Sequence, residues 1–153
     1  MRKYKVLGND KDFTDGTIEF DYEPLDPSFA TVFFRWQNEG ENECFYFRTG
    51  RAGNPTAEDA VQYAPFLSGI MIWDMLGHFQ GNASFKKQEW NHVKLVVSGA
   101  QMRAYVNSES RPTLAVPRLE GNVTNGRIGF AGEAIIANLI IKPKDQWKIA
   151  VRG

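Results

Sequence analysis

Glu19, Asp21 and Glu23 are spaced two residues apart in a segment whose intervening residues are aromatic. Because alternate side chains of a β-strand point to the same face, the three carboxylates are expected to share one face. A retaining glycoside hydrolase needs two carboxyl groups about 5 to 5.5 Å apart, on either side of the bound sugar. The spacing therefore makes these residues candidate catalytic carboxylates, and a solvated strand face is the alternative interpretation.

A second set of residues combines aromatic rings with guanidinium and amide groups. Sugar rings offer C–H faces that stack on aromatic rings, and their hydroxyls need fixed donors and acceptors. The residues that we predict to line one sheet face and to bind a glycan in this way are Arg35, Tyr46, Arg48, Gln62, Tyr63 and Trp73. The alternative is that these side chains satisfy one another inside the fold.

His78 lies between two glycines in the loop segment 76–81 and could carry a proton in a glycan-processing reaction. An ordinary solvent-exposed loop histidine is the alternative. Asn9, Asp10, Asp12 and Asp15 could supply oxygen ligands to calcium, although their spacing misses that of an EF-hand loop by one residue. We therefore predict no cofactor and leave calcium as the one metal with candidate ligands.

The composition is that of one globular domain spanning residues 1–153, with 42% hydrophobic and 24% charged residues. Eighteen basic residues balance eighteen acidic ones, so the formal net charge is zero. Nucleic acids and anionic membranes bind to cationic surfaces, so this balance argues against both partners. Cys44 is the only cysteine, which excludes an internal disulfide bond and a zinc site with several cysteines.

The elements that must position these residues are short β-strands, because β-branched and aromatic runs alternate with Gly, Asn, Asp and Pro. The predicted strands are Gly16 to Glu23, Ala30 to Gln37, Cys44 to Thr49, Gly69 to Met75, His92 to Ser98, Met102 to Asn107, Gly126 to Ala131 and Ala134 to Lys142. This pattern predicts an all-β fold, an antiparallel β-sandwich or jelly roll of two packed sheets. The segment 51–63 is predicted to be a long loop with one helical turn capped by Thr56.

Alternation along each strand predicts which residues face the core. In segment 32–37 the even-numbered residues, including Trp36, form the predicted core row, and Arg35 faces the other way. In segment 44–48 Phe45 and Phe47 form the core row, while Tyr46 and Arg48 face the other way. The second faces therefore mix aromatic and charged residues, as a sugar site requires.

The run Phe-Thr-Asp-Gly-Thr-Ile-Glu-Phe-Asp at residues 13–21 resembles the opening strand of laminin-G-type and 3-keto-disaccharide hydrolase-like domains. Segments 33–35, 89–95, 105–107, 126–130 and 137–139 follow in the same order as in those domains. Over residues 13–143 the chain thus resembles the concanavalin A-like lectin/glucanase superfamily, which implies a jelly-roll sandwich. The superfamily includes lectins, glycosidases, polysaccharide lyases and protein-binding domains, so the fold alone does not select an activity.

Within this resemblance, Arg35, Arg48 and the segment 62–65 look like the concave-face and rim positions of a glycan-binding relative. The alternating carboxylates have the spacing of laminarinase and lichenase glycosidases, but Phe20 stands where those enzymes carry a small aliphatic residue. The motif also opens the chain instead of lying in its middle. The resemblance therefore implies glycan binding more directly than hydrolysis.

We predict a carbohydrate-binding domain that holds an oligo- or polysaccharide on a concave sheet face. A glycoside hydrolase or other glycan-processing enzyme is the first alternative, and a protein-interaction module is the second. A glycan-binding domain is expected to be secreted or periplasmic. No apolar run of the kind found in signal peptides follows residues 1–5, so a cytoplasmic location stays open. No sequence feature predicts an oligomeric state.

Overall fold

The structure is a computed structural model that describes residues 4–7, 13–25, 29–51, 53–72, 79–83, 85–86, 89–107 and 110–144. Among these residues no helix has the length and apolar composition needed to cross a membrane. A 3-10 turn, η1 at Thr49–Arg51, is the one helical element named within them. The described part of the chain is otherwise built from β-strands and their connections.

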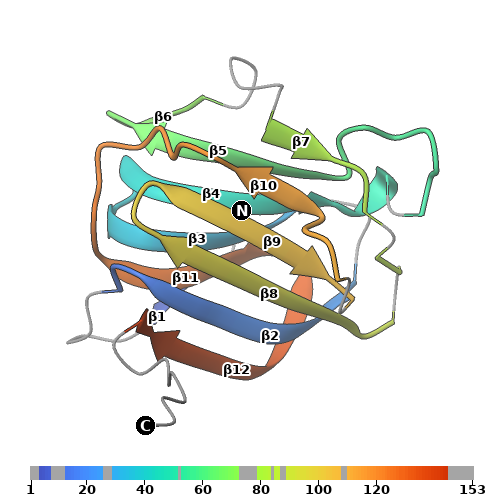
Figure 1. Cartoon of the computed structure of the whole chain (residues 1–153). Coiled ribbons are helices and arrows are strands. Elements are labelled where there is room, and N and C mark those ends of the chain that lie inside the picture. The colour runs from blue at the N-terminus through green and yellow to red at the C-terminus, as the bar shows by residue number, and fades with distance from the viewer. Residues whose placement is uncertain are drawn as a thin grey trace, which may run out of the picture.

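Two antiparallel sheets form the molecule (Figure 1). The seven-stranded sheet has the order β1-β11-β3-β4-β5-β6, and β7 also pairs with β5. Its strands are β1 Tyr4–Leu7, β3 Phe29–Asn38, β4 Glu41–Arg48, β5 Val61–Leu67, β6 Ile70–Met71, β7 Gln80–Gly81 and β11 Arg127–Gly132.

The five-stranded sheet, nearer the viewer in Figure 1, has the order β10-β9-β8-β2-β12. Its strands are β2 Gly16–Pro24, β8 Asn91–Ser98, β9 Gln101–Val106, β10 Leu114–Val116 and β12 Ala134–Pro143. The inner faces of both sheets carry the main hydrophobic core, and strict alternation of buried and half-buried residues along β2 and β8 places one side of each strand in it. The predicted jelly-roll β-sandwich is confirmed.

Aromatic side chains join the two sheets across the core. Phe20 of β2 meets Phe130 of β11 edge to face, with ring centroids 5.2 Å apart. Tyr22 of β2 stacks on Phe47 of β4, with centroids 4.6 Å apart. Such pairs contribute about 0.5 to 1.5 kcal/mol beyond the burial of their surface, so they help to fix how the sheets pack.

All eight predicted strand segments overlap strands of the structure, but β1, β5, β7 and β10 are absent from the prediction. The expected loop 51–63 ends at Ala60, and β5 begins at Val61. The helical turn expected at Thr56 is wrong, because the Thr56 amide donates to Asn54 Oδ1 at 3.0 Å in a turn. Pro65 argues against a central strand from sequence alone. The missing N–H of Pro65 is tolerated because β6 and β7 pair with other residues of β5, so no described strand on that side needs a hydrogen bond from it. On the other side Pro65 pairs with Glu43 of β4.

A β-bulge in β3 changes which residues face the core. The pairing of β3 with β11 shifts register between Phe33 and Trp36, and Arg35 lies there in the left-handed region with φ of 50°. Because a bulge adds one residue to one strand, the alternation slips by one position. Trp36, predicted to face the core, instead packs against Phe33 on the outer face, with ring centroids 5.0 Å apart. That prediction is therefore wrong.

Candidate functional site

The outer face of the seven-stranded sheet carries a groove of about 510 Å³. Strands β3, β4, β5, β6 and β7 supply its lining, together with the connection before β5. The lining residues are Phe29, Thr31, Phe33, Tyr46, Arg48, Asp59, Phe66, Met71 and Gln80. A volume of this size is in the range of small-molecule and cofactor sites, so one or two sugar rings are of suitable size.

Gln62 lies beneath the groove and connects the polar side chains of its lining. Its Oε1 accepts hydrogen bonds from Tyr46 Oη at 2.5 Å, Arg48 Nη2 at 2.6 Å and Gln80 Nε2 at 2.9 Å. Gln62 itself is fully buried, and the three donors come from two other strands, β4 and β7. Buried polar networks of this kind hold side chains in one arrangement, so the lining is preorganised for a polar ligand.

Arg48 is held in place from three directions. Its Nη1 donates to the Asp59 carbonyl oxygen at 2.7 Å, and its Nη2 donates to Tyr46 Oη at 3.0 Å as well as to Gln62. Its Cζ lies 4.9 Å from the centroid of the Tyr46 ring and 5.9 Å from that of Phe29. Since a guanidinium has five N–H donors, a fixed Arg48 can still offer donors to a ligand in the groove.

Burial raises the pKa of Tyr46 to about 12, the largest effect, while the nearby Arg48 acts in the opposite direction. The phenol therefore stays protonated at neutral pH and remains a hydrogen-bond donor to Gln62. The carboxylate of Asp59 brings one negative charge to the groove, where it pairs with Arg51 at 2.9 Å and lies 4.0 Å from Arg48 Nε. The polar side of the groove thus contains both donors and an acceptor.

Aromatic and aliphatic side chains form the other side of the groove. Phe29 is 56% exposed and meets Tyr46 edge to face, with centroids 5.9 Å apart. Phe33 is buried beneath the groove, and Phe66 and Met71 pack against the same outer-face cluster. An exposed ring beside a fixed guanidinium is the combination that sugar recognition needs, since the ring can stack on C–H groups and the guanidinium can bind hydroxyls.

Arg35 does not belong to this groove. The bulge turns its side chain to the end of the sandwich, where Nε and Nη2 donate to the Thr14 carbonyl oxygen at 2.9 and 2.7 Å. Nη2 also donates to Asp15 Oδ1 at 3.1 Å and to the Gly99 carbonyl oxygen at 2.8 Å. Arg35 is 4% exposed. It connects β3 to two segments of the other sheet, the one before β2 and the turn between β8 and β9. The prediction that it shares a face with Arg48 is wrong.

Tyr63 also lies away from the groove. Its neighbour Gln62 faces outward, so Tyr63 faces the core, where its hydroxyl donates to Glu43 Oε1 at 2.9 Å and accepts from the Glu120 amide at 2.8 Å. Burial raises the pKa of Glu43 to about 7, against the opposing effect of the Tyr63 hydrogen bond. The prediction that Tyr63 shares a face with Gln62 is wrong, because the strand β5 was taken for a loop.

Several predicted residues lie outside the part of the chain that the structure describes: Trp73, His78, Asn9, Asp10 and Asp12. Asp15, the fourth calcium candidate, accepts hydrogen bonds from Arg35 and, at 2.6 Å, from the Gly99 amide. Within the described ranges, no group of three or more His, Cys, Asp or Glu side chains is arranged to hold a metal ion.

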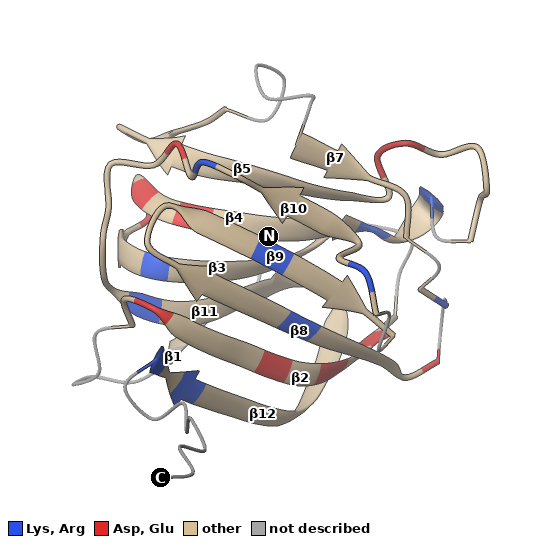
Figure 2. Ribbon diagram, viewed as in Figure 1, with Lys and Arg blue, Asp and Glu red and all other residues tan. Residues whose placement is uncertain are grey.

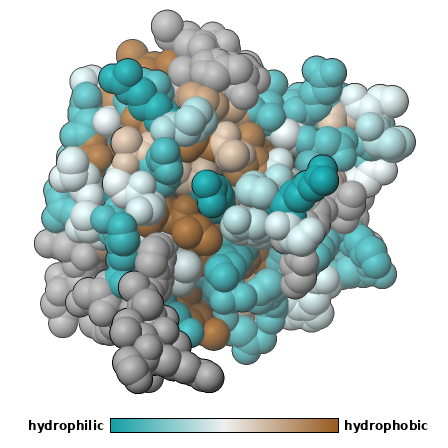
Figure 3. All heavy atoms as spheres, viewed as in Figure 1, coloured by the Kyte–Doolittle hydropathy of each residue, from teal (hydrophilic) through white to brown (hydrophobic). Residues whose placement is uncertain are grey.

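The three alternating carboxylates lie on β2, where Figure 2 shows acidic positions in red. The alternation of buried and half-buried residues along β2 places them on the outer face of the five-stranded sheet, away from the groove. Glu19 and Asp21 bracket His92: Nδ1 lies 2.8 Å from Asp21 Oδ1, and Nε2 contacts Glu19 Oε2. Asn138 Nδ2 donates to the other Asp21 oxygen at 2.7 Å, and Glu23 lies farther along the strand. Figure 3 shows hydrophobic atoms scattered among hydrophilic ones on this side of the molecule.

These contacts give the carboxylates a histidine partner that the sequence did not indicate. Hydrogen bonds to Asp21 and Glu19 raise the pKa of His92, although its partial burial acts in the opposite direction. The pKa of Asp21 is lowered, chiefly by its hydrogen bond from Asn138 and then by that with His92. The cluster is therefore a set of ion pairs on a sheet face, and it contributes no side chain to the groove.

Of the predicted ligand-binding residues, the structure thus brings Tyr46, Arg48 and Gln62 together. The sequence analysis missed Phe29, Asp59 and Gln80 as further members of the site. Gln80 lies on a strand of two residues, too short for any alternation, and Asp59 lies in the connection before β5. Phe29 follows Pro27 and Ser28 at a predicted strand start, and this exposed aromatic could have been selected.

A family model described as the 3-keto-alpha-glucoside-1,2-lyase-like domain matches residues 2–139. No curated protein matches the sequence significantly.

The solved structures of similar fold include a carbohydrate binding module and galectins. The carbohydrate binding module CBM66 from Bacillus subtilis superposes with a TM-score of 0.67 at 14% identity, over 90% of this chain and 80% of that one. The Caenorhabditis elegans galectin LEC-6 has a TM-score of 0.61 at 11% identity, over 91% and 95% of the two chains. Chicken galectin 2 has a TM-score of 0.64 at 10% identity, over 86% and 93%. At these identities the likeness shows a shared fold.

Proposed function

The chain belongs to the 3-keto-alpha-glucoside-1,2-lyase-like domain family, and from this membership and the geometry of the outer groove we propose that it binds glycans. The observation that carries the proposal is the fixed network of Tyr46, Arg48, Gln62 and Gln80 beside the exposed ring of Phe29. The family name indicates α-glucosides and their 3-keto derivatives as the first ligands to try.

The arrangement of donors and acceptors supports a sugar rather than a purely apolar ligand. Arg48 and Gln80 both line the groove and are both bonded to Gln62 Oε1, so neither has to be reoriented when a ligand arrives. Hydroxyl groups of a sugar can accept from the guanidinium and donate to the Asp59 carboxylate. Phe29 lies within reach of the same guanidinium, so a ring stacked on it would bring its hydroxyls to Arg48.

A binding screen tests the proposal. The protein is titrated with α- and β-linked gluco- and galacto-oligosaccharides and with 3-keto-α-glucosides, and binding is measured by calorimetry. For the best ligand, Arg48→Ala is expected to weaken binding about tenfold to a hundredfold, because hydrogen bonds to a charged group are lost. Tyr46→Phe, which keeps the ring and removes the hydroxyl, is expected to weaken binding less.

Arg103→Ala is the matched control, because Arg103 is an exposed arginine on β9 of the other sheet. It should leave the affinity unchanged. Equal losses for Arg48→Ala and Arg103→Ala would place the site elsewhere, and a screen without any bound glycan would contradict the proposed function. A thermal melt of each variant separates loss of binding from loss of folding.

A second candidate function is elimination from a 3-keto-α-glucoside in the same groove. The family name and the Asp59 carboxylate in the lining favour it. The hydrogen on carbon 2 of such a sugar is acidic because it is next to the ketone. In this candidate reaction Asp59 takes that proton, a double bond forms between carbons 1 and 2, and the bond between carbon 1 and the glycosidic oxygen breaks. The leaving oxygen takes a proton from water, and the hydroxide that remains recovers the proton from Asp59. Arg48 would stabilise the enolate oxygen that develops at carbon 3.

Release of the aglycone from a 3-keto-α-glucoside measures this activity. Asp59→Asn should abolish it while binding is kept. Glu19→Gln, on the opposite sheet, is the control and tests the alternating carboxylates at the same time. If Glu19→Gln abolishes turnover and Asp59→Asn does not, the reaction takes place on the outer face of the five-stranded sheet instead.

A further inference from the structure

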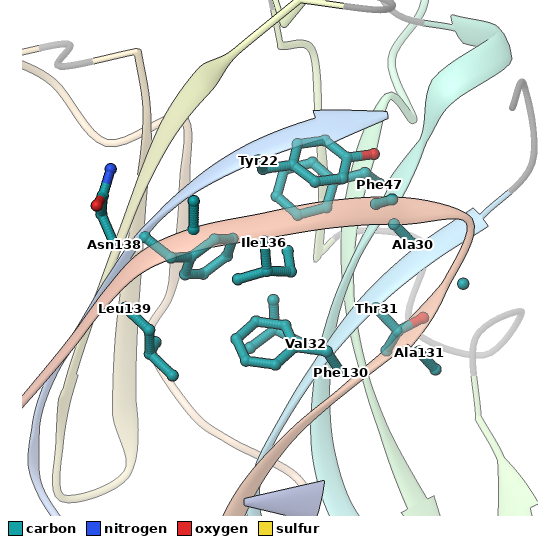
Figure 4. Close-up of a pocket in the computed structure, with 14 residues that line it drawn as sticks. Tyr22, Ala30, Thr31, Val32, Phe47, Phe130, Ala131, Ile136, Asn138 and Leu139 are labelled. Atoms are coloured by element: carbon teal, nitrogen blue, oxygen red, sulfur yellow. The ribbon is translucent and has the colours of Figure 1, made fainter. Parts of the chain in front are cut away.

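A second cavity, of about 540 Å³, lies between the two sheets and reaches the turn from β11 into β12 (Figure 4). Strands β2, β3, β4, β11 and β12 supply its lining. Two aromatic pairs that join the sheets, Phe20 with Phe130 and Tyr22 with Phe47, belong to this lining. The cavity is therefore a part of the sandwich interior, distinct from the groove on the outer face.

Small residues explain why this part of the interior is unfilled. The lining includes the five small residues Ala30, Ala131, Gly132, Ala134 and Ala137. Packed sheets lie about 10 Å apart, a distance that small side chains do not span. In addition, β12 carries a bulge between Ala137 and Ile140, where Asn138 adopts a φ of 55°. The edge strand therefore does not follow β2 closely over the cavity.

Two polar side chains of the lining, those of Tyr22 and Asn138, are already bonded within the protein. The Tyr22 hydroxyl shares a hydrogen bond of 3.2 Å with Thr49 Oγ1, and Asn138 Nδ2 donates to Asp21 Oδ2 at 2.7 Å. A buried water needs two to four polar partners, which this lining is poorly equipped to supply. A dry void of this size is also unfavourable, because protein interiors keep few voids larger than a water molecule. An apolar occupant fits the cavity best.

We propose that the cavity between the sheets binds the alkyl chain of an uncharged molecule. The occupant enters at the β11–β12 turn and extends along β12 past Ile136 toward Leu139, at the other end of the cavity (Figure 4). Glu133 lies exposed in this turn, and Glu23 pairs with Ile135 next to it. Their negative charge disfavours an anionic head group. The proposal does not depend on glycan binding, since Thr31 is the one described residue that the linings of the cavity and the groove share.

Titration with n-alkanols from hexanol to decanol, well below denaturing concentrations, tests this site. Methyl resonances of Ile136 and Leu139 should shift saturably, and the melting temperature should rise with alkanol concentration because the ligand binds only the folded protein. Decanoate, with the same chain length and a negative charge, should bind more weakly than decanol. Methyl resonances that do not shift with any alkanol would overturn the proposal.

A cavity-filling variant gives the sharpest result. In Ala30→Leu three added carbon atoms displace about three methylene groups of the ligand, so affinity should fall roughly fifty-fold while the melting temperature is kept or raised. Ala115→Leu, on the exposed side of β10, is the control and should bind as the parent does. If Ala30→Leu does not fold, Ala134→Leu fills the same cavity from β12. Unchanged affinity in a folded filled variant would contradict the proposal.

Discussion

Arg35 and Arg48 lie on neighbouring strands of one sheet, each close to aromatic residues in the sequence, yet their environments differ. Arg35 is turned to the end of the sandwich and bonds to backbone carbonyl oxygens of Thr14 and Gly99, which lie outside the groove lining. Arg48 lines a groove and bonds to side chains that also reach it. The difference shows that a guanidinium on a sheet strand is available to a ligand only where the backbone presents it to an open surface.

The largest effect that separates the two arginines is expected from Arg35→Ala. Its removal takes the side-chain donor from two carbonyl oxygens and the cationic partner from the Asp15 carboxylate, which should lower the free energy of unfolding by about 3 kcal/mol. For a chain of this size the melting temperature should then fall by about 10 °C. Calorimetry measures this loss, and glycan affinity below the transition should be kept. Equal stability of Arg35→Ala and the exposed Arg103→Ala would contradict the structural role of Arg35.

Glu43 is a buried carboxyl of β4 on the core side of the sheet that carries the groove, so its environment contrasts with that of Arg48. Its pKa is raised from 4.5 to about 7, so between these pH values the folded protein holds a proton that the unfolded chain releases. Stability contributed in this way is present below pH 4.5 and is lost as the pH rises through 7, by up to about 3 kcal/mol.

Glu43→Gln removes this titration and keeps an oxygen to accept from Tyr63. The variant should be more stable than the parent at pH 8, and its free energy of unfolding should change less between pH 5 and pH 8, as chemical denaturation measures. Parallel curves for parent and variant would show that Glu43 is ionised in the folded protein throughout this range.

Phe29→Ala tests the groove with a smaller effect. Loss of the stacking ring should weaken glycan binding by about 1 kcal/mol, or roughly fivefold, while the stability changes by less than about 0.5 kcal/mol. Trp90→Ala removes another exposed aromatic residue, which lies outside the groove lining, and should leave binding unchanged. Full affinity in the Phe29→Ala variant would show that the glycan does not stack on Phe29.

The smallest effect is expected on the five-stranded sheet, at the His92 cluster. The pKa of His92 is raised above 6.5 by Asp21 and Glu19, so its contribution to stability is fully present below pH 6.5 and is lost as the pH rises through the folded pKa. Partial exposure screens this contribution. His92→Gln should therefore lower stability slightly at pH 6 and not at pH 9, whereas an equal loss at both pH values would indicate packing instead of charge.

The sequence predicted the fold and the regular part of the site for the same physical reason. Strand β4 has no bulge between Cys44 and Arg48, so alternation placed Tyr46 and Arg48 on the outer face and Phe45 and Phe47 in the core. Where strands are regular, period-two patterns identify their faces.

The failures have equally local causes. No glycine or asparagine marks the bulge at Arg35, so nothing in the sequence signals the slip of one position that turns Arg35 and Trp36 around. Pro65 argues against a strand at β5. Because that strand was not predicted, the opposite orientations of Gln62 and Tyr63 were not predicted either. Gln80 comes to the groove through the pairing of β7 with β5, a contact between segments that alternation along one strand does not reveal.

Nuclear magnetic resonance of the side-chain amides is the most direct test of the claim that the outer groove holds the glycan. During titration with the best ligand from the screen, the amide resonances of Gln80 and Gln62 should shift saturably. Those of Asn138, on the other sheet, should not move. Shifts at Asn138 with none at Gln80 would contradict the account and would place glycan binding on the face that carries Glu19, Asp21 and His92.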